Sequence, residues 1–183
     1  MDKDKEKSIG RELLGWVVYI LVIVGLTYLI VTFIGQRTHV EGHSMETTLS
    51  DGDQLIVDKI SFKFRDPKRY EIIIFPYRYD DKHYIKRIIG LPGETVQVMD
   101  GKVYINGEIL DEHFGNEEMD NAGIAAEPIT LGDDEYFVLG DNRNHSSDSR
   151  DPNVGILHRS ELTGRAWIRI WPLNKFGVIR HEQ

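Results

Sequence analysis

The sequence predicts a mainly β domain, a compact and partly open barrel or sandwich of antiparallel sheets, behind one N-terminal transmembrane helix. Three observations lead to this fold class. One uncharged apolar segment occupies residues 13–34. Short runs rich in β-branched residues follow it, separated by Gly, Pro, Asn and Asp turn residues. The 183 residues suffice for one ordinary domain and are too few for two.

The composition excludes several classes of protein. Asp and Glu number 30 against 22 Lys and Arg, a formal net charge of -8, whereas a surface that binds nucleic acid is usually basic. The chain contains no cysteine, which excludes disulfides, cysteine zinc sites, iron–sulfur clusters and thiol nucleophiles. We therefore expect no nucleic-acid partner.

Residues 13–34 form the predicted membrane anchor, with the lipid bilayer as a partner. As a helix this segment would span about 33 Å, enough to cross the hydrocarbon core. It is longer than the ~7–15 apolar residues of a cleavable signal peptide, and no small-x-small cleavage site follows it. Trp16, Tyr19 and Phe33 stand near its ends, where interfacial aromatic residues are common. We expect an uncleaved, single-pass anchor.

The distribution of Lys and Arg predicts the orientation of this anchor. Four of them precede the apolar segment, and only Arg37 lies within the first twenty residues after it. Because Lys and Arg are retained on the cytoplasmic side, residues 1–12 are expected in the cytoplasm and residues 35–183 on the other side of the cell membrane. The latter range is the predicted extracytoplasmic domain.

Six runs within this domain are predicted to form strands or hairpins, at residues 54–57, 71–75, 83–89, 96–110, 136–139 and 166–171. The run 96–110 contains the dipeptides Asp100-Gly101 and Asn106-Gly107, which favour type I′ turns and therefore consecutive hairpins. Residues 111–128 are acidic and lack periodicity, which predicts an exposed surface loop.

Three segments carry residues typical of catalysis. Residues 39–49 hold Ser44 at a transition from strand to turn, residues 84–94 hold Lys86 within an apolar strand, and residues 140–151 are dense in polar groups. Strand alternation places Lys86 and Arg87 on opposite faces, so one of these two cations is predicted to point inward or into a cleft. Each segment alone also has a structural explanation, such as a turn hydroxyl or an edge-strand lysine.

Signatures of metals and nucleotide cofactors are missing from the sequence. There is neither a phosphate-binding glycine loop nor a dinucleotide-binding glycine pattern. His39 and His43 are four residues apart but lie in a stretch predicted to be extended, and residues 141–152 lack the glycine and the bidentate glutamate of a calcium-binding EF-hand. We expect no metal and no cofactor.

Taken together, the three segments resemble the conserved boxes of type I signal peptidases, membrane-bound Ser–Lys endopeptidases that remove signal peptides from exported proteins. Residues 44–49, Ser-Met-Glu-Thr-Thr-Leu, are similar to the serine box Ser-Met-x-Pro-Thr-Leu. Residues 84–94 resemble the lysine box, and residues 140–150 match Gly-Asp-Asn-Arg-x-x-Ser-x-Asp-Ser-Arg at every specified position. The resemblance covers essentially the whole chain, and the single span resembles the Gram-positive bacterial form.

The sequence departs from the family pattern at three places. In the segment 69–75, which is similar to another box of the family, Tyr70-Glu71 replaces the usual Gly-Asp. Thr47 replaces the usual Pro of the serine box. Gly42 stands two residues before Ser44, where some members have a hydroxyl residue that helps to form the oxyanion hole. The backbone N–H of Ser44 is then the expected oxyanion donor, and the second donor stays open.

The resemblance implies a role for each matching residue. Ser44 would be the nucleophile and a neutral Lys86 the general base, with Ser146 hydrogen-bonded to Lys86. Asp148 and Arg150 would brace the loop as a charge-assisted pair. Substrates would be secretory preproteins with small residues at the first and third positions before the cut. The residues implied to line or adjoin the shallow apolar pockets for them are Val40, Met45, Leu49, Tyr84 and Ile85.

Three alternative functions compete with this interpretation. One is a membrane-anchored β domain that binds export signals without cutting them, although Ser44 and Lys86 are both present. Another is a self-cleaving repressor-type Ser–Lys peptidase, but those proteins are soluble. A penicillin-binding acyl transferase would require Ser-x-x-Lys and Lys-Thr-Gly motifs, which are missing here.

Overall fold

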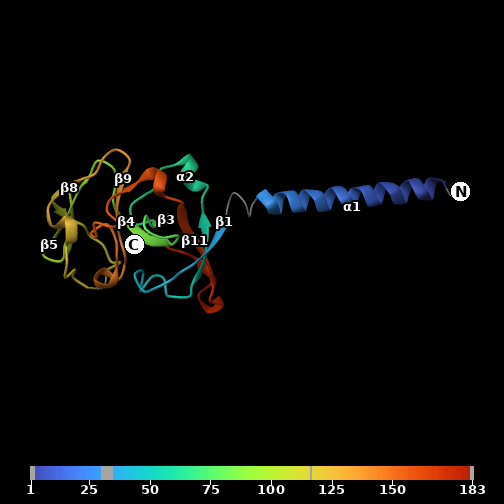
Figure 1. The fold of residues 1–183 in the computed structure, drawn as a ribbon. Helices are drawn as coiled ribbons and strands as arrows, with labels where there is room; N and C mark the ends of the chain where they lie inside the picture. Colours follow the sequence, from blue (N-terminus) through green and yellow to red (C-terminus); the bar gives the residue numbers. More distant parts are fainter. Residues whose placement is uncertain (1–2, 30–34, 116, 182–183) are drawn as a thin grey trace.

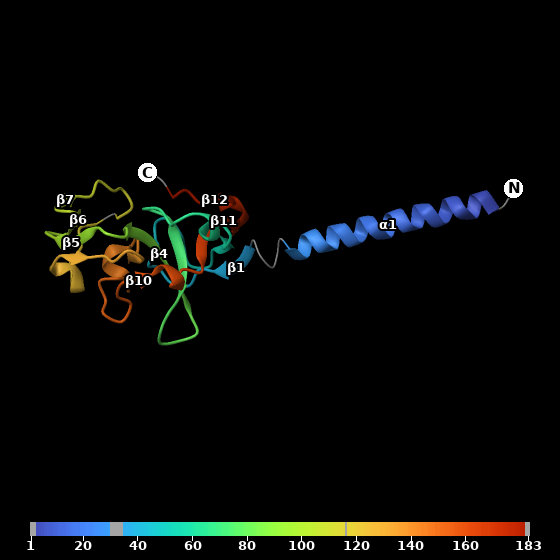
Figure 2. The same cartoon turned by 90° about the horizontal axis from the view of Figure 1, so that it is seen from above.

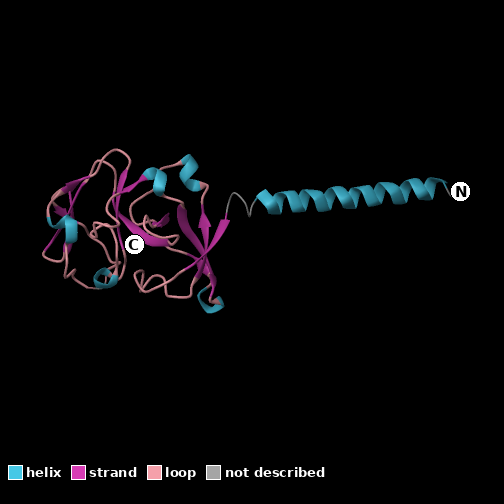
Figure 3. Ribbon diagram, in the orientation of Figure 1, coloured by secondary structure: helices cyan, strands magenta, loops and turns pink. Residues whose placement is uncertain are grey.

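The computed structural model describes residues 3–29, 35–115 and 117–181. Helix α1 (Lys3–Leu29) extends away from a β-rich domain that contains the rest of the described chain (Figure 1). Strands and loops dominate this domain, and its helices are short (Figure 3). The prediction of a mainly β domain behind one N-terminal helix is confirmed.

Helix α1 carries the apolar segment predicted as the anchor. From Gly10 to Tyr28 it is long and apolar enough to cross a membrane, and none of this stretch is buried against the protein. Residues 30–34, which include Phe33 and the end of the predicted anchor, lie outside the described residues. An apolar surface of this extent without protein contacts is what a bilayer-embedded helix presents.

Two antiparallel sheets make up the β domain. The large sheet has the order β1 (Gly35–His39), β2 (Gln54–Asp58), β11 (Gly164–Trp171), β3 (Ile72–Pro76), β4 (His83–Gly90), β9 (Glu135–Leu139) and β10 (Leu157–His158), with β12 (Gly177–Val178) paired to β11. The small sheet has the order β7 (Glu108–Ile109), β6 (Lys102–Ile105), β5 (Thr95–Met99) and β8 (Ile129–Thr130). It lies at the end of the domain away from α1 (Figures 1 and 2).

Every predicted run forms strands, with bounds that differ by at most two residues. The turns Asp100-Gly101 and Asn106-Gly107 have positive φ at both positions, between 51° and 83°, as type I′ turns require. Strand β1 was not among the six predicted runs, because its sequence Gly-Gln-Arg-Thr-His has no apolar alternation, although the stretch that begins at His39 was predicted to be extended. Its register with β2, from Gly35 opposite Asp58 to His39 opposite Gln54, provides the hydrogen bonds that make it a strand.

Strand β4 lies at the centre of the packing and contributes to all three apolar clusters. Ile85, Ile88 and Ile89 each belong to a different cluster, so both faces of this strand are covered. Lys86 is consequently only 4% exposed and Arg87 is 0% exposed. The prediction that one of these two cations points inward is corrected, because both are buried.

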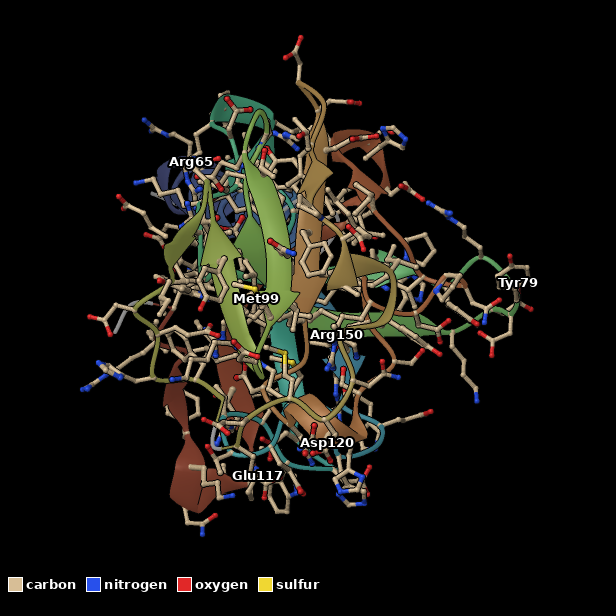
Figure 4. The ribbon with its side chains drawn as sticks, turned by 90° about the vertical axis from the view of Figure 1, so that its left-hand side faces the viewer. Arg65, Tyr79, Met99, Glu117, Asp120 and Arg150 are labelled. Atoms are coloured by element: carbon tan, nitrogen blue, oxygen red, sulfur yellow. The ribbon has the colours of Figure 1, made fainter. Side chains whose placement is uncertain are left out.

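The acidic segment 111–128 is only partly the exposed loop that the sequence predicts. Glu117 and Asp120 are exposed, and both are labelled at the surface in Figure 4. Met119 and Ala125, however, are buried in the cluster beneath the small sheet. The Phe114 ring centroid also lies 3.6 Å from the Arg87 guanidinium carbon. Single buried side chains of this kind leave no periodic pattern in a sequence.

Gly90 lies at the junction of the two sheets, where there is no room for a larger side chain. A Cβ at this position would lie 2.5 Å from Val96 Cγ2 on β5, 2.8 Å from Leu131 Cδ1 and 2.9 Å from Phe137 Cβ on β9. We expect Gly90→Ala to lower the free energy of unfolding by about 1–3 kcal/mol through overpacking. Denaturant unfolding of the full chain in detergent measures this loss.

Gly177→Ala is the matched control for this substitution. No atom lies within 4 Å of a Cβ at Gly177, so the unfolding midpoint of this variant should stay close to that of the wild type. Equal midpoints for the two variants would contradict the close packing between the sheets.

Candidate active site

Ser44 lies in a turn that follows β1. The turn covers residues 44–48, and Gly42 enters it with a φ of 86°, a left-handed conformation that favours glycine. The Ser44 carbonyl accepts a hydrogen bond from the Asn142 N–H at 3.0 Å, and the Asn142 side-chain amide donates to the His43 carbonyl at 3.2 Å. The segment after β9 therefore holds this turn in place.

Lys86 reaches Ser44 from β4. Its Nζ lies 2.8 Å from Ser44 Oγ and 3.1 Å from the Ile85 carbonyl oxygen. Lys86 pairs with Ile73 of β3 in the ladder, which fixes the backbone from which the side chain projects. A nucleophilic hydroxyl and an amine are thus within hydrogen-bond distance although 42 residues separate them.

Burial changes the acidity of this amine. Because desolvation penalises the ammonium form, the pKa of Lys86 falls from its ordinary 10.5 to about 8, although Asp148 and Asp141 favour the charged form. On the order of a tenth of the amines are then neutral at pH 7, compared with fewer than one in a thousand for an exposed lysine.

A buried ion pair stands beside Lys86. Arg87 Nε donates to Asp141 Oδ1 at 2.8 Å and Arg87 Nη2 donates to Asp141 Oδ2 at 2.6 Å, and both side chains are inaccessible to solvent. Thr48 Oγ1 donates to Asp141 Oδ2 at 2.6 Å. Neither this ion pair nor the contact of Thr48 was predicted from the sequence. A buried strand arginine requires an acidic partner, which is the signal that could have identified Asp141.

The predicted charge-assisted pair of Asp148 and Arg150 is present. Arg150 Nε and Nη2 each donate to an Asp148 carboxylate oxygen at 2.9 Å. Asp148 Oδ2 also accepts a hydrogen bond from the Gly140 N–H at 3.1 Å, and Arg150 Nη2 donates to the Arg143 carbonyl at 2.5 Å. These bonds close the loop that follows β9.

The predicted hydrogen bond from Ser146 to Lys86 is not formed. Among the described residues, Ser146 Oγ is buried and has no hydrogen-bond partner, while Lys86 Nζ contacts Ser44 and Ile85 instead. The Ser146 hydroxyl is nevertheless close to the nucleophile turn. A Cβ at Gly140 would lie 2.2 Å from Ser146 Oγ and 2.5 Å from the Ser44 carbonyl oxygen, so only glycine allows this approach.

A pocket of about 220 Å³ opens onto Ser44 and Lys86. Four of the five residues that the sequence suggested for substrate binding line it, namely Val40, Met45, Tyr84 and Ile85. Leu49 does not line this pocket. It is 0% exposed and belongs to the apolar cluster behind the pocket, because the turn directs it into the core.

The rim of this pocket carries residues that the sequence did not indicate. His43, His83 and His145 line it from three different segments. His43 Nδ1 lies 2.8 Å from Glu46 Oε1, and this partner raises the pKa of His43. Within the described residues, no group of three or more His, Cys, Asp or Glu side chains is arranged to hold a metal ion.

Comparisons with known proteins identify the family to which the chain is similar. The family model described as signal peptidase, peptidase S26, matches residues 13–171. A probable signal peptidase I-2 of Synechocystis sp. is 41% identical over 163 residues, covering 82% of this chain and 70% of the relative. A signal peptidase I of Bacillus licheniformis is 35% identical over 182 residues, covering 96% and 97%.

A crystal structure of a signal peptidase I from Enterococcus faecalis V583 is 36% identical in sequence, with a TM-score of 0.47 over 55% of this chain and 97% of that chain. The family match extends from the apolar helix to the end of β11. The chain therefore belongs to the signal peptidase I family, peptidase S26, which consists of membrane-associated serine peptidases that cleave signal peptides.

Proposed function

We propose that this protein removes signal peptides from exported preproteins with Ser44 as the nucleophile and Lys86 as the general base. The observation that carries the proposal is the 2.8 Å distance between Lys86 Nζ and Ser44 Oγ at the base of the pocket. A serine hydroxyl needs a base at this distance, and only a neutral amine can accept its proton. The lowered pKa of Lys86, about 8, makes that neutral form accessible.

The same amine serves both halves of the reaction. As Ser44 Oγ attacks the scissile carbonyl carbon, Lys86 Nζ takes its proton, and the resulting ammonium donates this proton to the leaving amine when the C–N bond breaks. In the second half Lys86 takes a proton from the water that attacks the acyl ester, and returns it to Ser44 Oγ. The backbone N–H of Ser44 is the proposed donor to the oxyanion.

The apolar pocket would select small side chains at the first and third positions before the cut. Met45 and Ile85 are almost fully buried, so they form a floor that has little room to move. Val40 and Tyr84 complete the apolar lining beside Ser44. A close-packed wall accepts a methyl group and excludes branched or aromatic side chains by overpacking.

Ser146, Asp148 and Arg150 are proposed as positioning residues. Once Ser44 Oγ is acylated, Lys86 Nζ loses its hydroxyl partner and must be held for the attack of water. The buried, unpartnered hydroxyl of Ser146 lies beside the Ser44 carbonyl and would accept this role. The Asp148–Arg150 pair would keep the Ser146 backbone in place.

The bilayer would hold the enzyme close to its substrates. We propose that α1 anchors the chain with its N-terminus in the cytoplasm and residues 35–183 outside it. Ser44 lies ten positions after Ile34, a reach of at most about 35 Å even when fully extended. The nucleophile would then act near the membrane surface, where the cleavage site of an exported chain emerges.

Replacement of either catalytic residue should abolish cleavage. We expect Ser44→Ala and Lys86→Ala to lower kcat/KM by more than about 1,000-fold, because attack requires both the hydroxyl and its base. Mass spectrometry of a model preprotein incubated with the full-length protein in detergent measures the product. Lys102→Ala, which changes an exposed lysine on β6, should cleave at the wild-type rate.

The pH dependence of cleavage tests the same assignment. Since the base must be neutral, kcat/KM should rise about tenfold per pH unit below pH 8 and level off above it. Cleavage that survives in Lys86→Ala, or a profile that is flat between pH 6 and 8, would exclude Lys86 as the base.

Burial of Lys86 also has a consequence for stability. At pH 7 Lys86 is mostly protonated in both the folded and the unfolded chain. The desolvation of its ammonium group therefore lowers the free energy of unfolding by its full amount. A fall in pKa from 10.5 to about 8 corresponds to about 3 kcal/mol, which Lys86→Met should recover at pH 7. Between pH 8 and 10.5 the folded chain loses its proton first, so the stability of the wild type rises and the difference shrinks.

Denaturant unfolding of the wild type and Lys86→Met at pH 7 and pH 10 checks this prediction. Lys102→Met replaces an exposed lysine and should show no such pH-dependent difference. A Lys86→Met protein that is no more stable than the wild type at pH 7 would contradict the desolvation of this amine.

A further inference from the structure

A row of three tyrosines leads outward from the substrate pocket along the β3–β4 hairpin. Tyr84 lines the pocket, and the Tyr77 ring stacks on it with the centroids 4.4 Å apart and the planes 3° from parallel. Tyr79 meets Tyr77 edge to face with the centroids 5.5 Å apart. We call Tyr77, Tyr79 and Tyr84 the tyrosine row. Its outermost member, Tyr79, is 69% exposed and stands out from the body of the domain in Figure 4.

The hairpin that carries this row is held in a defined position. The Tyr77 N–H donates to the Lys82 carbonyl at 2.8 Å and closes the turn. Arg78 Nη2 donates to the Ile156 carbonyl at 3.2 Å and lies 3.2 Å from Glu161 Oε1. Although the hairpin projects from the domain in Figure 2, these contacts from a distant part of the chain fix its base. The tyrosine row is therefore a preorganised surface.

The backbone beside the row is open to an extended peptide. On the side of β4 opposite β3, β9 pairs with Arg87, Ile88 and Gly90 but not with residues 83–86 in the described structure. A peptide whose small side chains fill the pocket can continue along this edge toward His83, away from Ser44. At about 3.3 Å per residue, its fourth to sixth residues before the cut would reach Tyr77 and Tyr79.

We propose that the tyrosine row is an extended subsite for apolar side chains four to six residues before the cut. The proposal rests on the proposed function, because that function sets which end of the peptide leaves the pocket toward His83. In a signal peptide an apolar segment of about 7–15 residues precedes the cleavage region, so its last residues would lie against the row. Aromatic faces bind such side chains by burying apolar surface.

Three peptides with one common cleavage site test the subsite. The short peptide begins three residues before the cut. Two long peptides begin eight residues before it, one with Leu, Val and Ala at the added positions and the other with Ser, Asn and Gln. Each peptide is incubated in detergent with four full-length proteins: the wild type, Tyr79→Ala, Tyr79→Phe and Phe64→Ala. Phe64 is the matched control, because it is an 84% exposed aromatic residue that does not line the pocket.

The expected result separates the subsite from the chemistry. Tyr79→Ala should lower kcat/KM for the long apolar peptide by about fivefold to tenfold, mainly through KM, because one aromatic contact is lost. Its kcat/KM for the short and the long polar peptides should stay within about twofold of the wild type. Tyr79→Phe keeps the ring and should behave as the wild type on all three peptides, as should Phe64→Ala.

Several outcomes would overturn the subsite. A loss by Tyr79→Ala that is equal for short and long peptides, or no loss on the long apolar peptide, excludes a role in binding the upstream segment. Unchanged kinetics in detergent with weaker binding to lipid vesicles would assign Tyr79 to the membrane instead. If the wild type cleaves none of the peptides, the proposed function fails and the subsite with it. If the wild type cleaves the short peptide and Tyr79→Ala shows no loss on the long apolar peptide, only the subsite fails.

Discussion

The buried ion pair between Arg87 and Asp141 joins the three segments from which the site is built. Arg87 is the neighbour of Lys86 on β4, Asp141 begins the loop after β9, and Thr48 binds Asp141 from the turn that starts at Ser44. In an interior without water, removal of one partner of such a pair costs about 3–5 kcal/mol, since the other charge is left uncompensated. The nucleophile, the amine and the loop are thereby held in fixed positions relative to one another.

The lowered pKa of Lys86 depends on how the neighbouring charges are compensated. Burial lowers this pKa, while Asp148 and Asp141 act to raise it. Each of these carboxylates is bound through both oxygens by an arginine, Asp148 by Arg150 and Asp141 by Arg87. Because their charge is largely neutralised by these partners, desolvation prevails at Lys86 and lowers its pKa to about 8. The two ion pairs thus influence the amine as well as the fold.

The sequence predicted those features of the fold and the site that follow from local patterns and motifs. The resemblance of the motifs to those of a known family implied that Ser44 and Lys86 work together, and Ser44 Oγ and Lys86 Nζ lie 2.8 Å apart. Alternation along β4 could not reveal that both of its faces are covered, because the covering residues come from distant segments. For the same reason Leu49, in the serine box, proved to be a core residue, and Ser146 lacks its predicted bond. Motif membership does not specify which side chains face the pocket.

One strand lies between the apolar segment and the Ser44 turn in the sequence. β1 begins at Gly35, directly after the apolar segment, and pairs with β2 along its whole length before the chain reaches the Ser44 turn. A paired strand does not swing freely, so its five residues, about 17 Å long, have a fixed place in the large sheet on the way to the Ser44 turn. With α1 in a bilayer as proposed, cleavage would be confined to bonds near the membrane surface. Selection of substrates would then rest on the depth of the cleavage site together with the shape of the pocket.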